Sequence, residues 1–265
     1  MPGGQVSESE PCRIRLMFRK GEPLKYISHL DLLRAWERML RRAGLPVAYS
    51  QGFNPHMKVT IAMPLPVGCT GEHEIADVIL EEQLTSAEFL AAIEGACPEG
   101  MGICEAKEVP LNGPAMPNLI RQATYRLTLS GIAEQDARQR VAALLEQQEV
   151  RVQFRDQSYD LRPLIQSIAV EAITAQDACA RDIAHQGDRT HGGTGTLLWD
   201  HGALSVSAAG ETFVSGEEVV MLDAVLLRDE KGRIGRPDVL LEALGLSEHA
   251  VGMCRTAILF DELHP

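Results

Sequence analysis

The residues most suited to chemistry are four arginines and a polar loop that follow one another near the start of the chain. The arginines are Arg34, Arg38, Arg41 and Arg42. On a helix this spacing places guanidinium groups along one side, where their planar forks can bind phosphate or carboxylate. The loop adds hydrogen-bond donors, aromatic rings and one more cation: Tyr49, Ser50, Gln51, Phe53, Asn54, His56 and Lys58. RNA recognition commonly combines such groups, so we predict an anion- or RNA-binding surface.

The same arginines have a simpler interpretation, which the sequence leaves open. They could form a solvated helix face that pairs with acidic residues elsewhere in the chain. Glu37 already stands four residues before Arg41, the spacing of a helical ion pair.

Two histidines belong to this stretch, His29 near the expected start of the helix and His56 in the loop. A histidine can bind a metal or transfer protons near neutral pH. Neither stands in an HxxxH or HExxH spacing, so we predict no metal site, no cofactor and no catalytic residue here. Both histidines remain candidates for ligand or RNA contacts.

The six cysteines lack the short spacings of metal and redox sites. No CxxC pair is present, and neither is the CxxxCxxC triplet that holds the cluster of radical S-adenosylmethionine (SAM) enzymes. We therefore expect reduced, unpaired thiols. A looser group of potential ligands is better interpreted as a solvated insertion, because its spacing is irregular: Cys179, His185, Asp188, His191, Asp200 and His201.

Fingerprints of familiar reactions are absent from the sequence as well. It has no phosphate-binding glycine loop, no nucleophile elbow and no dinucleotide-binding motif. Asp77, Glu81 and Glu82 could form an acid pair, but a charged strand end explains them equally well. We therefore favour a protein that is not itself an enzyme.

Charge is distributed unevenly along the 265 residues, whose net charge is −12. Between Arg13 and Lys58 there are ten basic and three acidic residues, whereas 15 basic and 32 acidic residues follow Lys58. The acidic total argues against non-specific nucleic-acid binding, while the basic segment provides a local site. The first residues lack the features of a signal peptide and no apolar run could span a membrane, so we expect a cytoplasmic protein without a membrane partner.

A capped helix is expected to position the arginines. Ser28 is its N-cap candidate, Ala43 its last residue and Gly44 its stop, with Pro46 shortly after. An apolar stripe would face the core: Leu30, Leu33, Trp36 and Leu40. The loop 50–58 then lies between two short strands, Val47–Tyr49 and Lys58–Met63.

The wider pattern predicts an α+β protein made of two ferredoxin-like (split βαβ) halves. Residues 12–109 read as strand, helix, strand, strand, helix and strand. Residues 110–118, rich in proline, form a linker. Residues 119–265 repeat the plan with loop insertions near 174–194 and 209–217, and residues 1–11 form a disordered tail.

Several motifs resemble one bacterial family, the radical SAM-associated (radical SAM-linked) proteins that share the DUF2344 domain of unknown function. The similar segments are SHLDL at Ser28–Leu32, RRAGLPVAYSQGFNPHMK at Arg41–Lys58, LPVG at Leu65–Gly68, DLRPLI at Asp160–Ile165, and the stretches RPDVLLEALGL and CRTAILF near the end. Met57 departs from the family, which usually has proline there, so the loop is expected to be less rigid.

The resemblance implies an accessory role beside a separately encoded radical SAM enzyme, often in the context of ribosomes and RNA processing. Our leading hypothesis is thus a non-catalytic accessory protein that binds RNA or a ribosomal particle through helix 28–43 and loop 50–58. The alternatives are a pure protein–protein adaptor that docks the enzyme without RNA, and an RNA-modifying enzyme with Asp31 or His56 as its acid–base group.

Overall fold

The computed structural model describes residues 10–174, 204–206, 212–214 and 218–260. The chain divides into two compact units, the first made of Met1–Val67, His73–Ile120 and Asp261–Pro265, the second of Gly68–Glu72 and Arg121–Phe260. Most of the predicted tail and of the insertions near 174–194 and 209–217 lies outside the described residues. The same holds for the cysteine and histidine group from Cys179 to His201.

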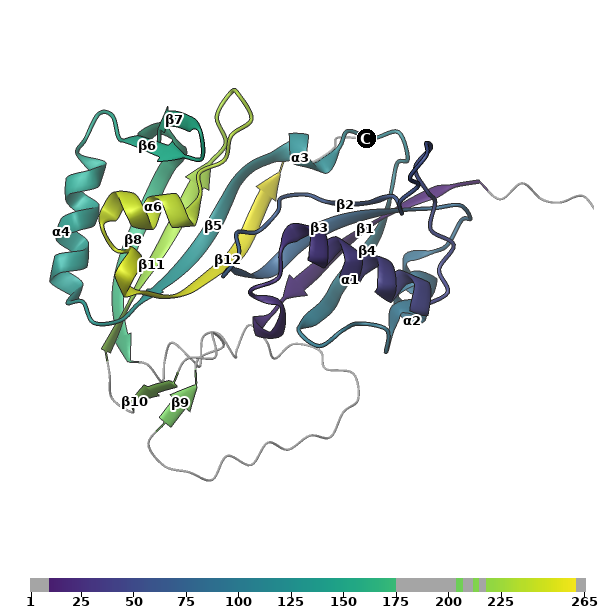
Figure 1. Cartoon of the computed structure of the whole chain (residues 1–265), viewed down its shortest axis with the longest axis horizontal. Coiled ribbons are helices and arrows are strands. Elements are labelled where there is room, and N and C mark those ends of the chain that lie inside the picture. Colours follow the sequence, from purple (N-terminus) through teal and green to yellow (C-terminus); the bar gives the residue numbers. More distant parts are fainter. Residues whose placement is uncertain (1–9, 175–203, 207–211, 215–217, 261–265) are drawn as a thin grey trace, which may run out of the picture. The chain divides into compact units, whose positions relative to one another are not determined.

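The first unit contains the predicted six elements in the predicted order. They are β1 (Cys12–Lys20), α1 (His29–Arg42), β2 (Val59–Ile61), β3 (Thr70–Leu80), α2 (Ser86–Ile93) and β4 (Met101–Val109), with a short 3-10 turn at Glu22–Leu24. The strands are ordered β4-β1-β3, and β2 pairs with β3. The pairs β1–β4 and β2–β3 are antiparallel. Helices α1 and α2 lie over one face of this sheet (Figure 1).

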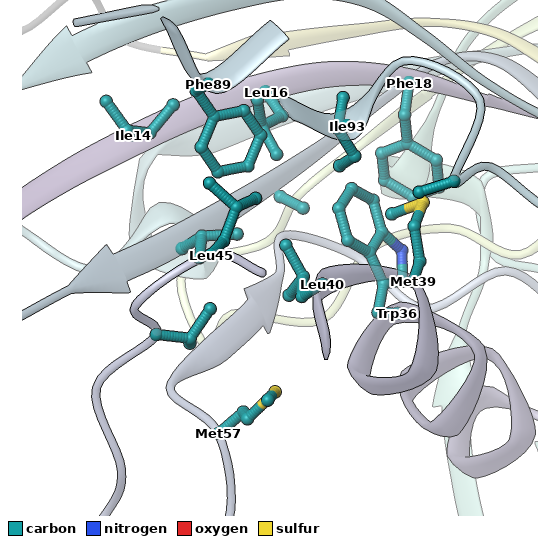
Figure 2. Close-up of a cluster of buried hydrophobic side chains, with 14 of the residues drawn as sticks. Ile14, Leu16, Phe18, Trp36, Met39, Leu40, Leu45, Met57, Phe89 and Ile93 are labelled. Carbon is teal, nitrogen blue, oxygen red and sulfur yellow. The ribbon is translucent and has the colours of Figure 1, made fainter. Parts of the chain in front are cut away.

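One hydrophobic core joins these helices to the sheet. Figure 2 shows Trp36 of α1 against Phe18 of β1 and Leu40 of α1 within the same cluster; the rings of Phe18 and Trp36 meet edge to face with centroids 5.0 Å apart. Such aromatic pairs contribute about 0.5–1.5 kcal/mol beyond the area they bury. The core is therefore what fixes the orientation of α1.

The buried stripe of α1 differs from the predicted one. Leu30 is 64% exposed, so its assignment to the core was wrong. The buried residues are Leu32, Ala35, Trp36, Met39 and Leu40. Because successive residues advance by about 100° around a helix, this set centres the buried face well away from Leu30.

The predicted linker has structure of its own. It contains the start of α3 (Met116–Leu119), and the Met116 side chain is completely buried. The carbonyls of Gly113 and Pro114 accept hydrogen bonds from the Arg13 guanidinium at 3.1 and 3.2 Å. This segment is thus fixed to β1.

Four strands of the second unit lie side by side in the order β12-β5-β11-β8. Its elements are β5 (Ile120–Leu129), α4 (Glu134–Leu145), β6 (Arg151–Phe154), β7 (Gln157–Asp160), β8 (Ile165–Thr174), β9 (Leu204–Val206), β10 (Thr212–Val214), β11 (Glu218–Leu227), α6 (Pro237–Leu244) and β12 (Ala250–Phe260), with 3-10 turns at Arg162–Leu164 and Ser247–His249. β6 pairs with β7 and β9 with β10. Thr70 and Gly71, at the start of β3, pair in parallel with Cys254 and Arg255 of β12.

The α+β class is therefore confirmed. Apart from the hairpins β6–β7 and β9–β10, the second unit also runs strand, helix, strand, strand, helix, strand, which is the element order of the ferredoxin-like plan. We did not predict β11 from the sequence. Val219, Leu222 and Ala224 on this strand are completely buried, and such a strand lacks the alternation that identifies half-exposed ones.

Candidate nucleic-acid interface

Helix α1 begins and ends as its sequence predicts. The Ser28 hydroxyl accepts a hydrogen bond from the Asp31 backbone N–H at 3.2 Å, and Gly44, with φ of +67°, follows the last turn. These two features fix where the helix begins and ends, and so the position of each arginine along it. The Ser28 hydroxyl also donates to the Asp31 carboxylate, which holds the pKa of Asp31 below its usual range, with a further contribution from Arg34. Asp31 is therefore an ionised cap residue, unsuited to donating a proton.

Three of the four arginines have partners in the first unit. Arg34 binds Asp31 at 2.8 Å, and Arg41 lies 3.7 Å from the Glu37 carboxylate. Arg42 donates to the Ala96 carbonyl at 2.8 Å. These partners are not the acidic residues elsewhere in the chain that the simpler interpretation expected: two are carboxylates of α1 itself and the third is a backbone carbonyl. The two ion pairs are near the surface, where such pairs are weak.

Arg38 is the exception. Its side chain is exposed, and within the described ranges it has no hydrogen bond or ion pair. Lys58, after the loop, is exposed in the same way and its side chain has no partner among the described residues. These two cations are the ones available to a phosphate without breaking an existing contact.

His29 does not join the arginines. It lies in the first turn of α1 on the side that turns toward the core, and its Nδ1 atom is buried without a hydrogen-bond partner. Burial lowers the pKa of His29, so the ring is neutral at pH 7. A half-buried neutral ring is a poor phosphate contact, which leaves His29 the weakest of the predicted site residues.

The loop 50–58 is closed by its own backbone. Tyr49 pairs with Met57 as an antiparallel bridge, and the Ser50 N–H donates to the His56 carbonyl at 2.8 Å. In return the His56 N–H donates to the Ser50 hydroxyl at 3.1 Å, and that hydroxyl lies 3.0 Å from His56 Nδ1. These contacts bring Ser50, Asn54 and His56 together, since Nδ1 also lies 3.4 Å from the Asn54 carbonyl.

Met57 anchors this loop. Its side chain is 5% exposed and belongs to the core around Trp36 and Leu40 (Figure 2). The loop was expected to be less rigid because Met57 lacks the ring of proline. Burial of the Met57 side chain restrains the end of the loop in a different way. The bridge, the hydrogen bonds and the Met57 anchor together hold both ends of the loop.

The tip of the loop faces solvent. Phe53 is fully exposed, at 106% of its reference area, and Tyr49 is 38% exposed. Gln51, Asn54 and His56 are also exposed, so the same loop presents polar groups to solvent. Solvent-exposed phenylalanine is unfavourable by about 1.5–3 kcal/mol relative to a buried one, which makes this ring a ready contact for a partner.

The loop and the arginine face are not joined by a direct contact. Within the described part of the chain, no hydrogen bond or ion pair connects Arg34, Arg38, Arg41 or Arg42 to loop 50–58. The helix and the loop are related only through the hydrophobic core, to which both contribute side chains. A candidate interface on this unit is therefore centred on the loop, and Arg38 is the one of the four arginines that has no partner among the described residues.

The carboxylates of β3 have a structural role. Asp77 is buried and accepts hydrogen bonds from the guanidinium groups of Arg13 and Arg15. Its oxygens are thus occupied, and it does not form an acid pair with Glu81 or Glu82, which are exposed.

The cysteines and potential metal ligands in the described ranges are separate side chains. Cys12, Cys69, Cys97, Cys104 and Cys254 are free of disulfides, and burial raises the pKa of Cys97 and of Cys104. No group of three or more His, Cys, Asp or Glu side chains in those ranges could hold a metal.

A pocket in the second unit was missed by the sequence analysis. Three basic side chains from the turn before α6 meet two aromatic rings of the hairpin β6–β7. The two segments lie more than 70 residues apart, and neither contains a recognisable motif. The sequence alone offers no local signal for this pocket, because its aromatic and basic side chains come from separate segments.

Comparison with known proteins identifies the family. Residues 13–191 match the model of DUF2344, described as an uncharacterized protein conserved in bacteria. The chain therefore belongs to the DUF2344 family. Among curated proteins no match was found. None of the helices in the described residues is long and apolar enough to cross a membrane.

Proposed function

We propose that this DUF2344 protein is a non-catalytic accessory protein of the cytoplasm that binds RNA or an RNA-containing particle. Its interface is loop 50–58 together with the exposed face of α1. It acts beside a separate radical SAM enzyme, as the resemblance to the radical SAM-linked proteins suggests. The observation that carries the proposal is Phe53, whose ring is fully exposed on a loop held at both ends.

An exposed aromatic ring on a fixed loop suits single-stranded RNA. Unstacked bases stack on such rings, and neighbouring amide and imidazole groups can bind the base edges. Asn54 and His56 follow Phe53 by one and three residues in the chain, and both are exposed. Because hydrogen bonds already order the loop, binding costs less conformational entropy than ordering a free segment.

The charge pattern favours specific contact over general attraction. The net charge of −12 repels a polyanion at long range, so binding depends on local cations. Arg38 and Lys58 supply these, since neither has an ion-pair partner among the described residues. Fewer arginines are available to RNA than the sequence suggested, because the Arg42 guanidinium already donates a hydrogen bond to a backbone carbonyl.

The test measures binding of fluorescein-labelled single-stranded RNA to the full chain by anisotropy. Phe53→Ala removes one stacking platform and is expected to weaken binding by about 5- to 150-fold, the equivalent of roughly 1–3 kcal/mol per stacked base. Leu259→Ala is the matched control, because Leu259 is also an exposed apolar side chain, at 56%. Equal affinities for the two variants would overturn the stacking role.

The cations are tested through the salt dependence of the same binding. Replacing Arg38 and Lys58 together by alanine should reduce the slope of log affinity against log salt by about 1.4, since each single-strand phosphate contact contributes about 0.7. Arg138→Ala is the control, because Arg138 is exposed and paired with Glu134 at 2.8 Å. An unchanged slope in the double variant would remove these cations from the interface.

The exposed ring also suits a protein partner, which gives the adaptor alternative its test. A radical SAM enzyme from the same bacterium is co-purified with the tagged chain, with and without nuclease treatment. Loss of the complex on nuclease treatment supports an RNA-mediated association. A complex that resists nuclease but is lost in Phe53→Ala would instead make the loop a protein-docking site.

A further inference from the structure

A pocket of about 350 Å³ lies in the second unit, between the hairpin β6–β7 and the turn that precedes α6. Figure 1 shows β6 beside α6, and the two elements are in contact. The pocket is lined by the rings of Phe154 and Tyr159 and by the basic side chains of Lys231, Arg233 and Arg236. None of its lining residues is acidic. Its composition is thus aromatic and cationic at once.

The two guanidinium groups are held in place before any ligand arrives. The Arg233 guanidinium lies 4.2 Å from the centre of the Tyr159 ring, and that of Arg236 lies 4.2 Å from the centre of the Phe154 ring. Arg233 also donates to the Gln157 amide oxygen at 3.3 Å. Stacking of this kind contributes about 0.5–2 kcal/mol per contact and restricts the flexible side chain. The pocket is therefore preorganised for a ligand.

The nearby carboxylates do not neutralise the site. Asp238 accepts two hydrogen bonds from Arg236, at 3.0 and 2.8 Å, and so balances that one charge. Asp229 accepts the Arg233 backbone N–H at 2.7 Å, which shapes the turn without contacting the guanidinium. Glu230 is exposed. In the described part of the chain Lys231 and Arg233 have no ion-pair partner, so both side chains are available to an anionic ligand.

Tyr159 adds a neutral donor. Its side chain is buried, and burial raises the pKa of its phenol, an effect that Arg233 and Arg236 partly oppose. The hydroxyl is therefore protonated at neutral pH and does not compete with a bound anion for the cations. It can instead donate a hydrogen bond to one.

We infer that this pocket binds a phosphomonoester of mononucleotide size, through Lys231 and Arg233, with its base against the aromatic and guanidinium faces. A guanidinium fork matches phosphate oxygens better than any other side chain. The volume lies at the small end of the roughly 300–1,000 Å³ of ligand pockets, too small for a large cofactor. The ligand is either a free nucleotide or the 5′-phosphorylated end of an RNA, because both present the same group. This inference does not depend on the interface of loop 50–58.

Calorimetric titration of the full chain with AMP and with adenosine tests it. AMP should bind at least about tenfold more tightly than adenosine, because only AMP carries the charged group that the cations recognise. Lys231→Ala and Arg233→Gln should each weaken AMP binding about tenfold or more. Arg138→Gln, on α4, is the control and should leave it unchanged. Because Lys231 is exposed and without a partner in the described residues, its variant keeps the fold.

Equal binding of AMP and adenosine would overturn the inference, as would no heat with millimolar AMP. So would variants of Lys231 and Arg233 that bind AMP as the wild type does.

A second pair of ligands separates the two sources of the phosphate. Short single-stranded RNAs with a 5′-phosphate and with a 5′-hydroxyl are compared in the Phe53→Ala background, which removes the proposed stacking contact of the loop. A gain from the 5′-phosphate that Arg233→Gln abolishes identifies RNA ends as the ligand. AMP binding without such a gain identifies a free nucleotide. The two proposals fail separately. If Phe53→Ala leaves RNA binding unchanged, the loop interface is wrong and the pocket inference stands; if Arg233→Gln leaves AMP binding unchanged, the pocket inference is wrong and the loop interface stands.

Discussion

The first unit contains a buried ion-pair network around Asp77, and its loss should strongly reduce the free energy of unfolding. This carboxylate is 5% exposed and serves two guanidinium groups, that of Arg13, which is 8% exposed, and that of Arg15, which is 12% exposed. Arg13 donates to it through Nε at 3.0 Å and also through Nη2, while Arg15 donates at 2.9 and 3.2 Å. Asp77→Asn keeps the shape but removes the negative charge, so both cations become buried without compensation.

The expected cost is large. Breaking a buried ion pair by removing one partner typically destabilises a protein by about 3–5 kcal/mol, because the remaining charge stays desolvated. At a denaturant slope of about 2 kcal/mol per molar urea, such a loss lowers the midpoint by roughly 2 M. The amide also turns donor groups toward the guanidinium N–H groups, which adds to the penalty.

Trp36 provides the signal. It is completely buried against Phe18, so its fluorescence reports unfolding of the first unit, provided that Trp199 is replaced by Phe in every protein compared. Glu105→Gln is the control, because Glu105 is 44% exposed and pairs with an exposed Lys107 at 2.8 Å. Surface pairs of this kind contribute about 0–1 kcal/mol. If Asp77→Asn lowers the urea midpoint no further than Glu105→Gln, the buried network does not have the stabilising role argued here.

Three smaller perturbations test other parts of the same unit by the same fluorescence signal. Thr85→Ala removes the capping box in which Thr85 and Glu88 bind each other's backbone, and should cost about 1 kcal/mol, whereas Ser86→Ala should cost less. Gly100→Ala should destabilise more than Gly95→Ala, because both glycines have positive φ but only at Gly100 would a new Cβ lie 3.0 Å from the Pro23 ring; equal losses would contradict that contact. Burial lowers the pKa of His29 from its usual 6.5, so the folded state resists protonation and its stability, complete above that value, should fall as the pH drops below it. The midpoint measured between pH 7.5 and 5.5 should fall less in His29→Gln, and an identical fall in both proteins would assign the effect to other groups.

Local sequence signals were sufficient for the main helices and strands of the first unit, although the predicted strand Val47–Tyr49 is present only as isolated bridges at Val47 and Tyr49. Ser28, Gly44 and the apolar residues between them specify α1 through interactions within a few residues, so its bounds could be predicted. It was harder to predict which side of that helix is buried. Leu30 and Leu32 are equally apolar, and only the position of β1, to which Phe18 belongs, decides which of them is buried.

The same limit applies to charge. Nothing close to Asp77 in the sequence indicates its partners, because Arg13 and Arg15 lie 64 and 62 residues away. Arg42 likewise finds the Ala96 carbonyl 54 residues later. A helical wheel assigned Arg42 to a binding surface because it counts charges without their tertiary partners. The number of basic residues in a sequence cluster is therefore the largest number of cations that a ligand can contact there, and tertiary contacts reduce it.

The pocket of the second unit illustrates the converse. Lys231, Arg233 and Arg236 occur in a stretch that also contains Asp229, Glu230 and Asp238, so its sequence looks electrically balanced. Folding directs one carboxylate to the backbone and a second to Arg236, while the aromatic rings arrive from the hairpin β6–β7. The fold thus directs the basic side chains of a nearly neutral segment into the pocket and none of its carboxylates, which neither composition nor spacing could predict. Ligand binding should therefore depend most on Lys231 and Arg233, because the carboxylates of Asp229 and Asp238 bind other groups and neither cation has an ion-pair partner among the described residues.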